Sequence, residues 1–201
     1  VANDVFWANS AGNHRQMHWR GDFTDPDRDF WLDFDNVAGH RYNTFYASAG
    51  KYIQACLWWD DSFSAATEDF DLWLAKLNPG TGQWEQVASS ERRQGGEAGQ
   101  TPVEIITYTA PTAGYYAWQV ARAWSARTDV DFDLLTPGVT LDNPSNPHAH
   151  WFSYERSCAQ PADNASAGFM AVAAVERAPG YVQATYSSQG PTRDGRITPE
   201  I

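Results

Sequence analysis

The sequence is dominated by short runs of alternating apolar and polar residues, each ending at a cluster of turn-forming residues. Residues 52–59 and 70–74 show the alternation most clearly, and further strand-like runs lie at 44–47, 84–88, 103–108, 115–122 and 130–134. No stretch between residues 14 and 143 keeps a helical period for ten residues. A period of two places alternate side chains on one face of a sheet. The spacing therefore predicts an antiparallel β-sandwich or jelly roll.

The composition is that of a folded chain with little affinity for membranes or nucleic acids. Hydrophobic residues make up 42% of the 201 residues, which is enough for a packed core. No window approaches the roughly 18 uninterrupted apolar residues that a membrane span needs. The 25 acidic and 14 basic residues give a net charge of −11, which repels a phosphate backbone. Nucleic acid is therefore not expected as a partner.

The two cysteines lie far apart in the sequence. Cys56 and Cys158 belong to no CxxC motif and have no histidine at metal-ligand spacing, which excludes a cysteine-based zinc site. The sequence leaves open whether they form one long-loop disulfide or remain two buried thiols.

Two apolar runs outside the alternating region have a different character. Residues 5–8 and 168–175 show no alternation, as expected of strands covered on both faces. Together with a Pro-containing linker near residues 144–147, they predict a β-sandwich inserted into a loop of an α/β domain. The expected domains are 1–16, 17–143 and 144–201. The abrupt ends suggest a piece of a longer or processed protein.

Two separated motifs resemble the subtilisin-like serine protease family. The first is Ser-Ala-Gly-Asn at residues 10–13, and the second is the stretch 184–201, which contains Ser-Ser-Gln-Gly-Pro and Asp-Gly-Arg. The apolar run 169–175 precedes the second motif, as in that family. The chain departs from the family pattern at Ala173, Thr198 and Glu200.

This resemblance implies a role in peptide-bond hydrolysis by an extracellular parent enzyme. Asn13 would donate its side-chain amide to the oxyanion hole, and Ser10, Ala11 and Gly12 would line the substrate pocket. The family's catalytic Asp, His and Ser motifs do not occur in this chain, so it would be inactive alone. Its partners would be the remainder of the protease domain and a peptide or protein substrate.

The middle of the chain resembles the bacterial pre-peptidase C-terminal domain, a small jelly roll. The resemblance rests on Trp-Asp-Asp at residues 59–61, on Glu-Asp-Phe-Asp-Leu-Trp-Leu at 68–74, and on Ala-Gly-Tyr-Tyr at 113–116. It implies that residues 17–143 form an accessory domain within the protease.

Two groups of aspartates are candidate structural calcium sites. Asp25, Asp27 and Asp29 repeat at i, i+2 and i+4, the spacing with which calcium loops arrange oxygen ligands. An EF-hand is excluded because Phe30 and Asn36 stand where Gly and Glu are required. The second group contains Asp60, Asp61, Asp69 and Asp71. Such like charges are costly without a cation or arginine partners, and both a calcium site and a solvated acidic face remain open.

Tryptophan is unusually frequent and supports an alternative from another functional class. Ten tryptophans occur in the chain, and exposed ones can stack on sugar rings or hold an apolar partner. Trp58 and Trp59 are adjacent in a predicted strand, so one of them must face outward. The alternative function is a non-enzymatic extracellular module that binds carbohydrate or protein, although core packing also explains tryptophans. His148 and His150 are interpreted as an exposed pair without a role.

Overall fold

The computed structural model describes residues 6–158, 162, 164–166, 168–177, 180–192 and 194–199. The chain divides into two compact units, which we call the sandwich unit (Trp19–Trp151) and the flanking unit (Val1–His18 with Phe152–Ile201). The domain identities expected from the sequence stay predictions. None of the described residues lies in a helix, so this part of the chain contains no helix that could cross a membrane.

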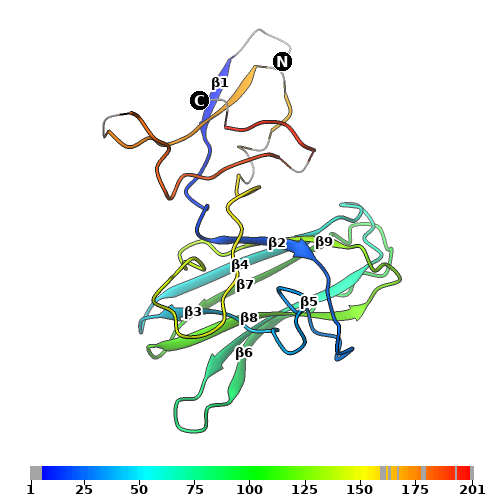
Figure 1. Cartoon of the computed structure of the whole chain (residues 1–201). Helices are drawn as coiled ribbons and strands as arrows, with labels where there is room; N and C mark the ends of the chain where they lie inside the picture. Colours follow the sequence, from blue (N-terminus) through cyan, green and yellow to red (C-terminus); the bar gives the residue numbers. More distant parts are fainter. Residues whose placement is uncertain are drawn as a thin grey trace. The chain divides into compact units, whose positions relative to one another are not determined.

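Eight of the strands form two four-stranded sheets (Figure 1). In the first sheet the order is β2 (His18–Asp22), β9 (Asp131–Leu135), β4 (Tyr52–Trp59) and β7 (Val103–Thr109). In the second it is β3 (Asn43–Ala47), β8 (Gly114–Trp124), β5 (Asp69–Leu77) and β6 (Trp84–Ser90). The β4 pairs with β7 and β9 are antiparallel, as are those of β8 with β3 and β5 and of β5 with β6.

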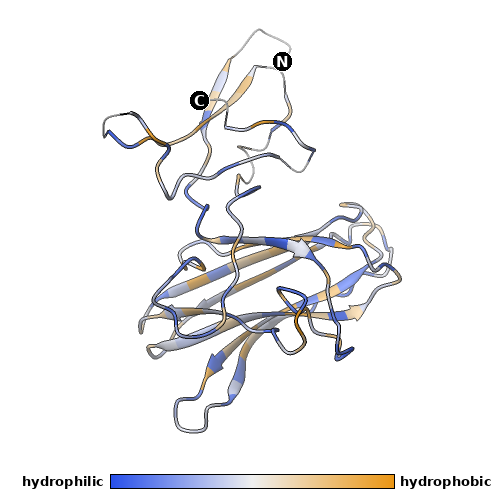
Figure 2. Cartoon of the chain, in the orientation of Figure 1, coloured by the Kyte–Doolittle hydropathy of each residue, from blue (hydrophilic) through white to orange (hydrophobic). Residues whose placement is uncertain are grey.

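The alternating pattern of the sequence buries one face of each sheet. Every second residue of β4 from Ile53 to Trp59 is fully buried, and β5 alternates in the same way from Phe70 to Leu74. Hydrophobic and hydrophilic bands alternate along these strands in Figure 2.

Aromatic rings join the two sheets. The ring of Phe70 on β5 lies 5.5 Å from that of Trp59 on β4 and 4.8 Å from that of Phe132 on β9, measured between centroids. These contacts confirm the predicted antiparallel sandwich.

The flanking unit contains one pair of parallel strands. β1 (Trp7–Ser10) pairs with β10 (Phe169–Val172), with Trp7 opposite Phe169. A small core of Ala11, Cys158, Ala162 and Ala171 packs beside them. The α/β domain expected from the sequence is not supported, because the described residues of this unit form no helix. Absence of alternation in the two apolar runs predicts buried strands but cannot show that helices cover them.

Candidate functional site

A pocket lined by aromatic side chains lies in the sandwich unit. Three segments build it: the chain leading into β3, the start of β6, and residues 148–151. Its volume is about 150 Å³. The lining residues are Gly39, His40, Tyr42, Thr44, Trp84, His148, Ala149 and Trp151. Small-molecule sites are typically lined by aromatic and apolar side chains together with a few polar groups, as here.

Hydrogen bonds hold the 148–151 segment against β3. Asn43 is fully buried, and its side chain donates to the carbonyl of Trp151 at 2.9 Å and accepts from the amide of Trp151 at 2.9 Å. The Thr44 hydroxyl donates to the carbonyl of Ala149 at 2.7 Å. The Asn146 amide donates to the carbonyl of Thr44 at 3.0 Å. These hydrogen bonds join side chains of one segment to backbone groups of the other. They therefore fix the position of residues 148–151 beside β3.

The rings on one side of the pocket form a continuous row. Tyr42 stacks on Trp84 with centroids 5.0 Å apart and ring planes 16° from parallel. Trp84 meets His148 edge to face at 6.2 Å, and His148 meets Tyr115 at 4.5 Å. Such offset and edge-to-face contacts fix the orientation of each ring.

A second stack of rings includes two further lining residues, Trp151 and His40. Trp151 lies parallel to Phe34 at 5.6 Å and tilted against His40 at 5.4 Å. Nδ1 of His40 lies 3.0 Å from each carboxylate oxygen of Asp35. Burial acts to raise the pKa of Asp35, but the hydrogen bonds and charge of His40 outweigh it and hold that pKa below its usual value. The site therefore offers aromatic faces with an imidazole, indoles and a phenol at their edges.

Sequence patterns do not predict this pocket. Its residues come from three segments at least forty positions apart in the sequence, and they meet only through the sheet order. The surplus of tryptophan is the one sequence signal, and it does not separate Trp84 and Trp151 from the core residues Trp59 and Trp118. His148, which the sequence suggested was an exposed residue without a role, lines the pocket.

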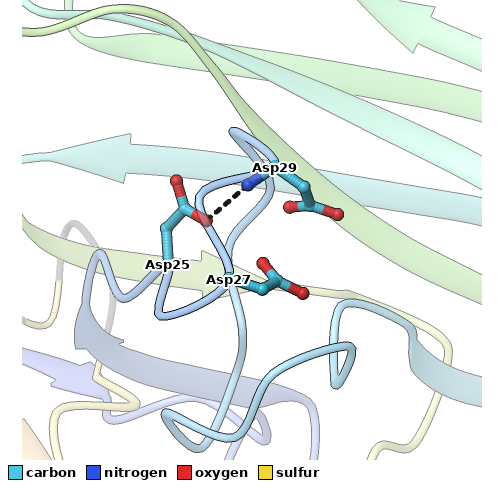
Figure 3. A group of neighbouring side chains, drawn as sticks. All are labelled: Asp25, Asp27 and Asp29. Atoms are coloured by element: carbon cyan, nitrogen blue, oxygen red, sulfur yellow. Dashed lines mark hydrogen bonds between the residues drawn. The ribbon is translucent and has the colours of Figure 1, made fainter.

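Asp25, Asp27 and Asp29 come together as their spacing predicts (Figure 3). One carboxylate oxygen from each lies within 4.8 Å of the others, so the three can hold a metal ion. Oδ1 of Asp25 accepts the backbone N–H of Asp29 at 2.9 Å, which folds the loop back on itself. Phe30, at the position where Gly is usual, has a φ of 70°, a left-handed conformation that glycine adopts without strain.

Two arginines already contact this aspartate triad. Nη2 of Arg122 on β8 lies 3.0 Å from Oδ2 of Asp25, and Nη1 of Arg41 lies 2.6 Å from Oδ2 of Asp29. The backbone places Arg122 there, because its N–H donates to the carbonyl of Phe30 at 2.8 Å. The end of β8 therefore runs alongside the acidic loop.

The carboxylate of Asp33 is buried and lies outside this group of three. The residue is only 1% exposed, and its Oδ2 has no hydrogen-bond partner among the described residues. Burial raises the pKa of Asp33, and the charges of Asp27, Asp29 and Asp25 raise it further. Sequence spacing gives no sign of this residue, since it lies outside the i, i+2, i+4 repeat.

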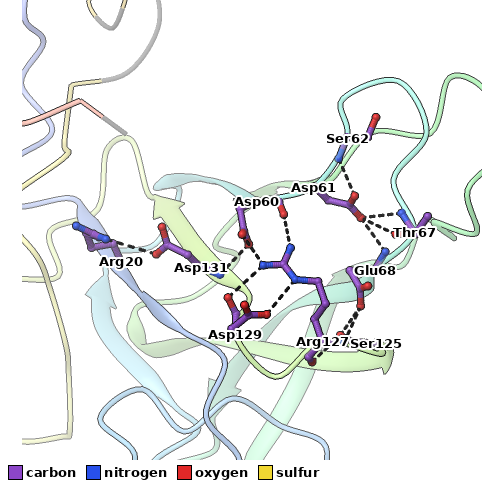
Figure 4. A network of polar contacts seen from close by, with 10 residues as sticks. All are labelled: Arg20, Asp60, Asp61, Ser62, Thr67, Glu68, Ser125, Arg127, Asp129 and Asp131. Carbon is purple, nitrogen blue, oxygen red and sulfur yellow. Dashed lines mark hydrogen bonds and ion pairs between the residues drawn. The ribbon is translucent and has the colours of Figure 1, made fainter. Parts of the chain in front are cut away.

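In the second predicted group, Asp60 and Asp61 have separate partners (Figure 4). Asp60 pairs with Arg127, whose Nη2 lies 2.6 Å from Oδ2. Asp61 accepts the backbone N–H groups of Ser62, Thr67 and Glu68. Burial acts to raise the pKa of Asp61, but these backbone hydrogen bonds outweigh it and lower the pKa.

Asp69 and Asp71 lie on β5 and have different surroundings. Oδ1 of Asp69 accepts the backbone N–H of Gln94 at 3.2 Å, and burial raises the pKa of Asp69. Asp71 has a pKa of about 6, raised by burial and by the charges of Asp69, Glu91 and Glu104. Among the described residues, only the Asp25–Asp29 loop gathers three potential ligands at metal-binding distance. Calcium at the second group stays a prediction.

The Ser-Ala-Gly-Asn motif forms the turn after β1. Ala11 is buried and donates to the carbonyl of Val172 at 2.8 Å, whereas Ser10 and Asn13 are exposed. The carbonyl of Gly12 accepts the N–H of Ser188 at 2.9 Å, and Gly12 has a φ of 95°, which favours glycine. The substrate-binding and oxyanion roles given to these four residues rest on the family resemblance alone.

The two cysteines are free thiols. Cys56 is partly buried on β4, and Cys158 is buried in the flanking unit. The disulfide that the sequence left open is not formed.

Comparisons with known proteins give distant structural likenesses only. No family model matches the chain, and no curated protein matches it. A mitogen derived from Yersinia pseudotuberculosis has a TM-score of 0.35 and 12% identity, covering 65% of this chain and 89% of the mitogen. CorA, a surface-associated copper-binding protein of Methylomicrobium album BG8, has a TM-score of 0.37 and 10% identity, covering 66% of this chain and 98% of CorA.

A third likeness is to part of a larger enzyme. The CBM22-1 and GH10 modules of endo-1,4-beta-D-xylanase 10B from Clostridium thermocellum give a TM-score of 0.31 and 14% identity. The match covers 73% of this chain and 30% of that chain. All three TM-scores are low, so these likenesses assign neither a family nor a function.

The resemblance to subtilisin-like proteases is wrong. No family model or curated protein supports it, and none of these three structures is a subtilisin or another protease. The motifs that suggested it are built around Gly, Ser, Asn, Asp and Pro, residues that favour the tight turns at which strands end. Turn chemistry of this kind constrains the local backbone but does not specify a family.

Proposed function

We propose that the sandwich unit is a non-enzymatic binding module that holds a carbohydrate in the aromatic pocket. The observation that carries this proposal is a cavity of about 150 Å³ whose lining includes Tyr42, Trp84, His148 and Trp151. Ring contacts hold these side chains, Tyr42 on Trp84, Trp84 on His148 and Trp151 on the buried Phe34. A sugar ring has an apolar face that packs on an aromatic ring and hydroxyls that meet its polar edges.

The size of the pocket favours a sugar over a protein partner. A stable protein interface buries roughly 800 Å² on each partner, whereas this site is a recess of about 150 Å³ lined by several rings. Its rings are also held before any ligand arrives, which reduces the conformational entropy that binding must overcome. An extracellular location, where polysaccharides occur, is part of this proposal.

Affinity electrophoresis in gels containing plant, fungal or bacterial polysaccharides tests the proposal. The native chain should be retarded by at least one polysaccharide, and Trp84→Ala should abolish that retardation. Trp124→Ala is the matched control, because Trp124 is 57% exposed and does not line the pocket. Thermal melting of both variants checks that they fold. No retardation across the panel, or equal retardation of Trp84→Ala, would contradict the proposal.

We also infer that the aspartate triad holds calcium rather than another metal. Its potential ligands are carboxylate oxygens from Asp25, Asp27 and Asp29, with no histidine or cysteine among them. Oxygen ligands of this kind suit Ca²⁺, whereas copper and zinc prefer nitrogen and sulfur. Bound calcium would stabilise the loop that leads from β2 to the pocket.

Melting of the chain in chelator, in calcium and in magnesium tests this inference. A cation that binds only the folded state at a hundredfold excess over Kd stabilises by about 2.7 kcal/mol. At about 2–4 °C per kcal/mol, that corresponds to a Tm rise of roughly 5–10 °C. Magnesium should raise the Tm less, because it dehydrates reluctantly. An equal Tm in chelator and in millimolar calcium would show that the triad is only a solvated acidic turn.

A further inference from the structure

A row of aromatic rings continues from the pocket onto neighbouring positions of β3 and β8. Trp84 and His148 line the pocket and contact each other, and His148 contacts Tyr115 with ring centroids 4.5 Å apart. Tyr115 in turn meets Tyr46 edge to face at 5.4 Å. Tyr46 and Tyr115 stand directly opposite each other in the pairing of β3 with β8. We call Trp84, His148, Tyr115 and Tyr46 the aromatic track.

The alternation of side chains along β3 places Tyr46 on the same face as the pocket. Phe45 and Ala47 are buried in the core, so Thr44 and Tyr46 project from the opposite face of the strand. Thr44 lines the pocket. Two residues of a strand span about 7 Å. The backbone at Tyr46 therefore lies about one sugar unit along β3 from a residue of the pocket.

The far end of the track is open to solvent. Tyr46 is 53% exposed, although Tyr115 holds its ring from one side. Single exposed aromatic residues are common on protein surfaces, but Tyr46 extends a row of rings that begins in a cavity. Among the described residues, the phenolic hydroxyls of Tyr46 and Tyr115 make no hydrogen bond, so both can exchange hydrogen bonds with a sugar.

We propose that the sandwich unit binds a chain of sugar units, with one unit in the pocket and the next over Tyr46 and Tyr115. The proposal rests on the carbohydrate binding proposed above and adds the class of ligand, a linear oligosaccharide or polysaccharide. A single sugar would occupy the pocket alone and leave the exposed ring of Tyr46 uncovered. A chain covers both places, and the ring contacts along the track orient the second place before the ligand arrives.

Calorimetric titration of the full chain with sugars of increasing length tests the proposal. The probes are glucose, cellobiose and cellohexaose, with the corresponding series built from xylose, mannose and N-acetylglucosamine. In at least one series the hexasaccharide should bind at least tenfold more tightly than the monosaccharide. Tyr46→Ala should weaken hexasaccharide binding about three- to tenfold, as expected for the loss of one aromatic contact. Its affinity for the monosaccharide should stay within twofold of that of the native chain.

Two further variants separate a sugar contact from a general effect of the substitution. Tyr52→Ala is the matched control, because Tyr52 is 55% exposed and lies on β4 in the other sheet. Its hexasaccharide affinity should equal that of the native chain. Tyr46→Phe keeps the aromatic face and should bind the hexasaccharide within threefold of the native chain. Thermal melting checks that each variant folds.

The possible failures of the extended site and of the pocket are distinct. Equal affinity for the monosaccharide and the hexasaccharide would overturn the extended site while leaving the pocket as a sugar site. Native-like hexasaccharide affinity in Tyr46→Ala, or an equal loss in Tyr52→Ala, would overturn it as well. A native chain that binds none of these sugars would instead overturn the carbohydrate function itself.

Discussion

Replacing Asp71 by asparagine should stabilise the sandwich at neutral pH and have little effect in acid. The carboxylate is partly buried on β5, and burial with the charges of Asp69, Glu91 and Glu104 raises its pKa from 3.8 to about 6. In the unfolded chain these influences are absent. The folded state therefore retains a proton over a pH range in which the unfolded state has released it, and stability falls as the pH rises from about 4 to about 6.

The magnitude follows from the size of that shift. One pKa unit corresponds to about 1.4 kcal/mol, so a rise from 3.8 to about 6 represents at most about 3 kcal/mol. Solvent screening of a partly exposed group reduces the figure, and we expect Asp71→Asn to stabilise by about 1–2 kcal/mol at pH 7.5. At about 2–4 °C per kcal/mol, the Tm should rise by roughly 2–8 °C.

Thermal melting of the native chain and the variant at pH 3.5 and pH 7.5 measures this difference. Glu91→Gln removes one of the neighbouring charges and should recover part of the gain at pH 7.5. Asp22→Asn, at the exposed end of β2, is a control that should change the Tm little at either pH. If Asp71→Asn shifts the Tm equally at both pH values, or lowers it at pH 7.5, the electrostatic reasoning is refuted.

Three further substitutions or reactions test other parts of the structure. Phe70→Ala should destabilise by about 3–5 kcal/mol in urea unfolding, because the Phe70 ring is fully buried between the sheets; a loss below 1 kcal/mol would contradict this packing. Arg127→Gln should cost about 1–2 kcal/mol by the same measurement, since it breaks the contacts with Asp60 and its carbonyl; an unchanged urea midpoint would contradict it. Burial raises the Cys56 pKa from 9.0 to about 11, so in a Cys158→Ser background its reaction with a disulfide reagent at pH 8 should be about 100-fold slower than in urea; equal rates would contradict it.

The strands of the sandwich could be predicted from the sequence because their physical cause is local. The predicted run 52–59 coincides with β4, and the run 103–108 falls short of β7 by one residue. Apolar alternation predicts which face of a strand is buried, and turn residues such as those at Asn78–Gly82 predict where a strand ends. The strand β2 is not predicted, because His18–Asp22 has no apolar alternation and only its first two residues are buried.

The candidate sites differ in the same way, because one is built from local residues and the other from distant ones. The Asp25–Asp29 triad could be predicted because its ligands lie within one loop and share a simple spacing. The aromatic pocket could not, since Tyr42, Trp84 and His148 meet only after both sheets have formed. The wrong family assignment has a related cause: short turn motifs follow from the local backbone, whereas only long-range packing establishes a whole domain.

Resonances of the tryptophan indole N–H groups, followed by NMR during titration with a polysaccharide fragment, test the binding function most directly. The ten tryptophans give separate reporters in one experiment. We expect the signals of Trp84 and Trp151 to shift in a saturable way, while those of the buried Trp59 and Trp118 and of the exposed Trp124 stay in place. Shifts confined to tryptophans outside the pocket, or no shifts with any fragment tested, would contradict the account.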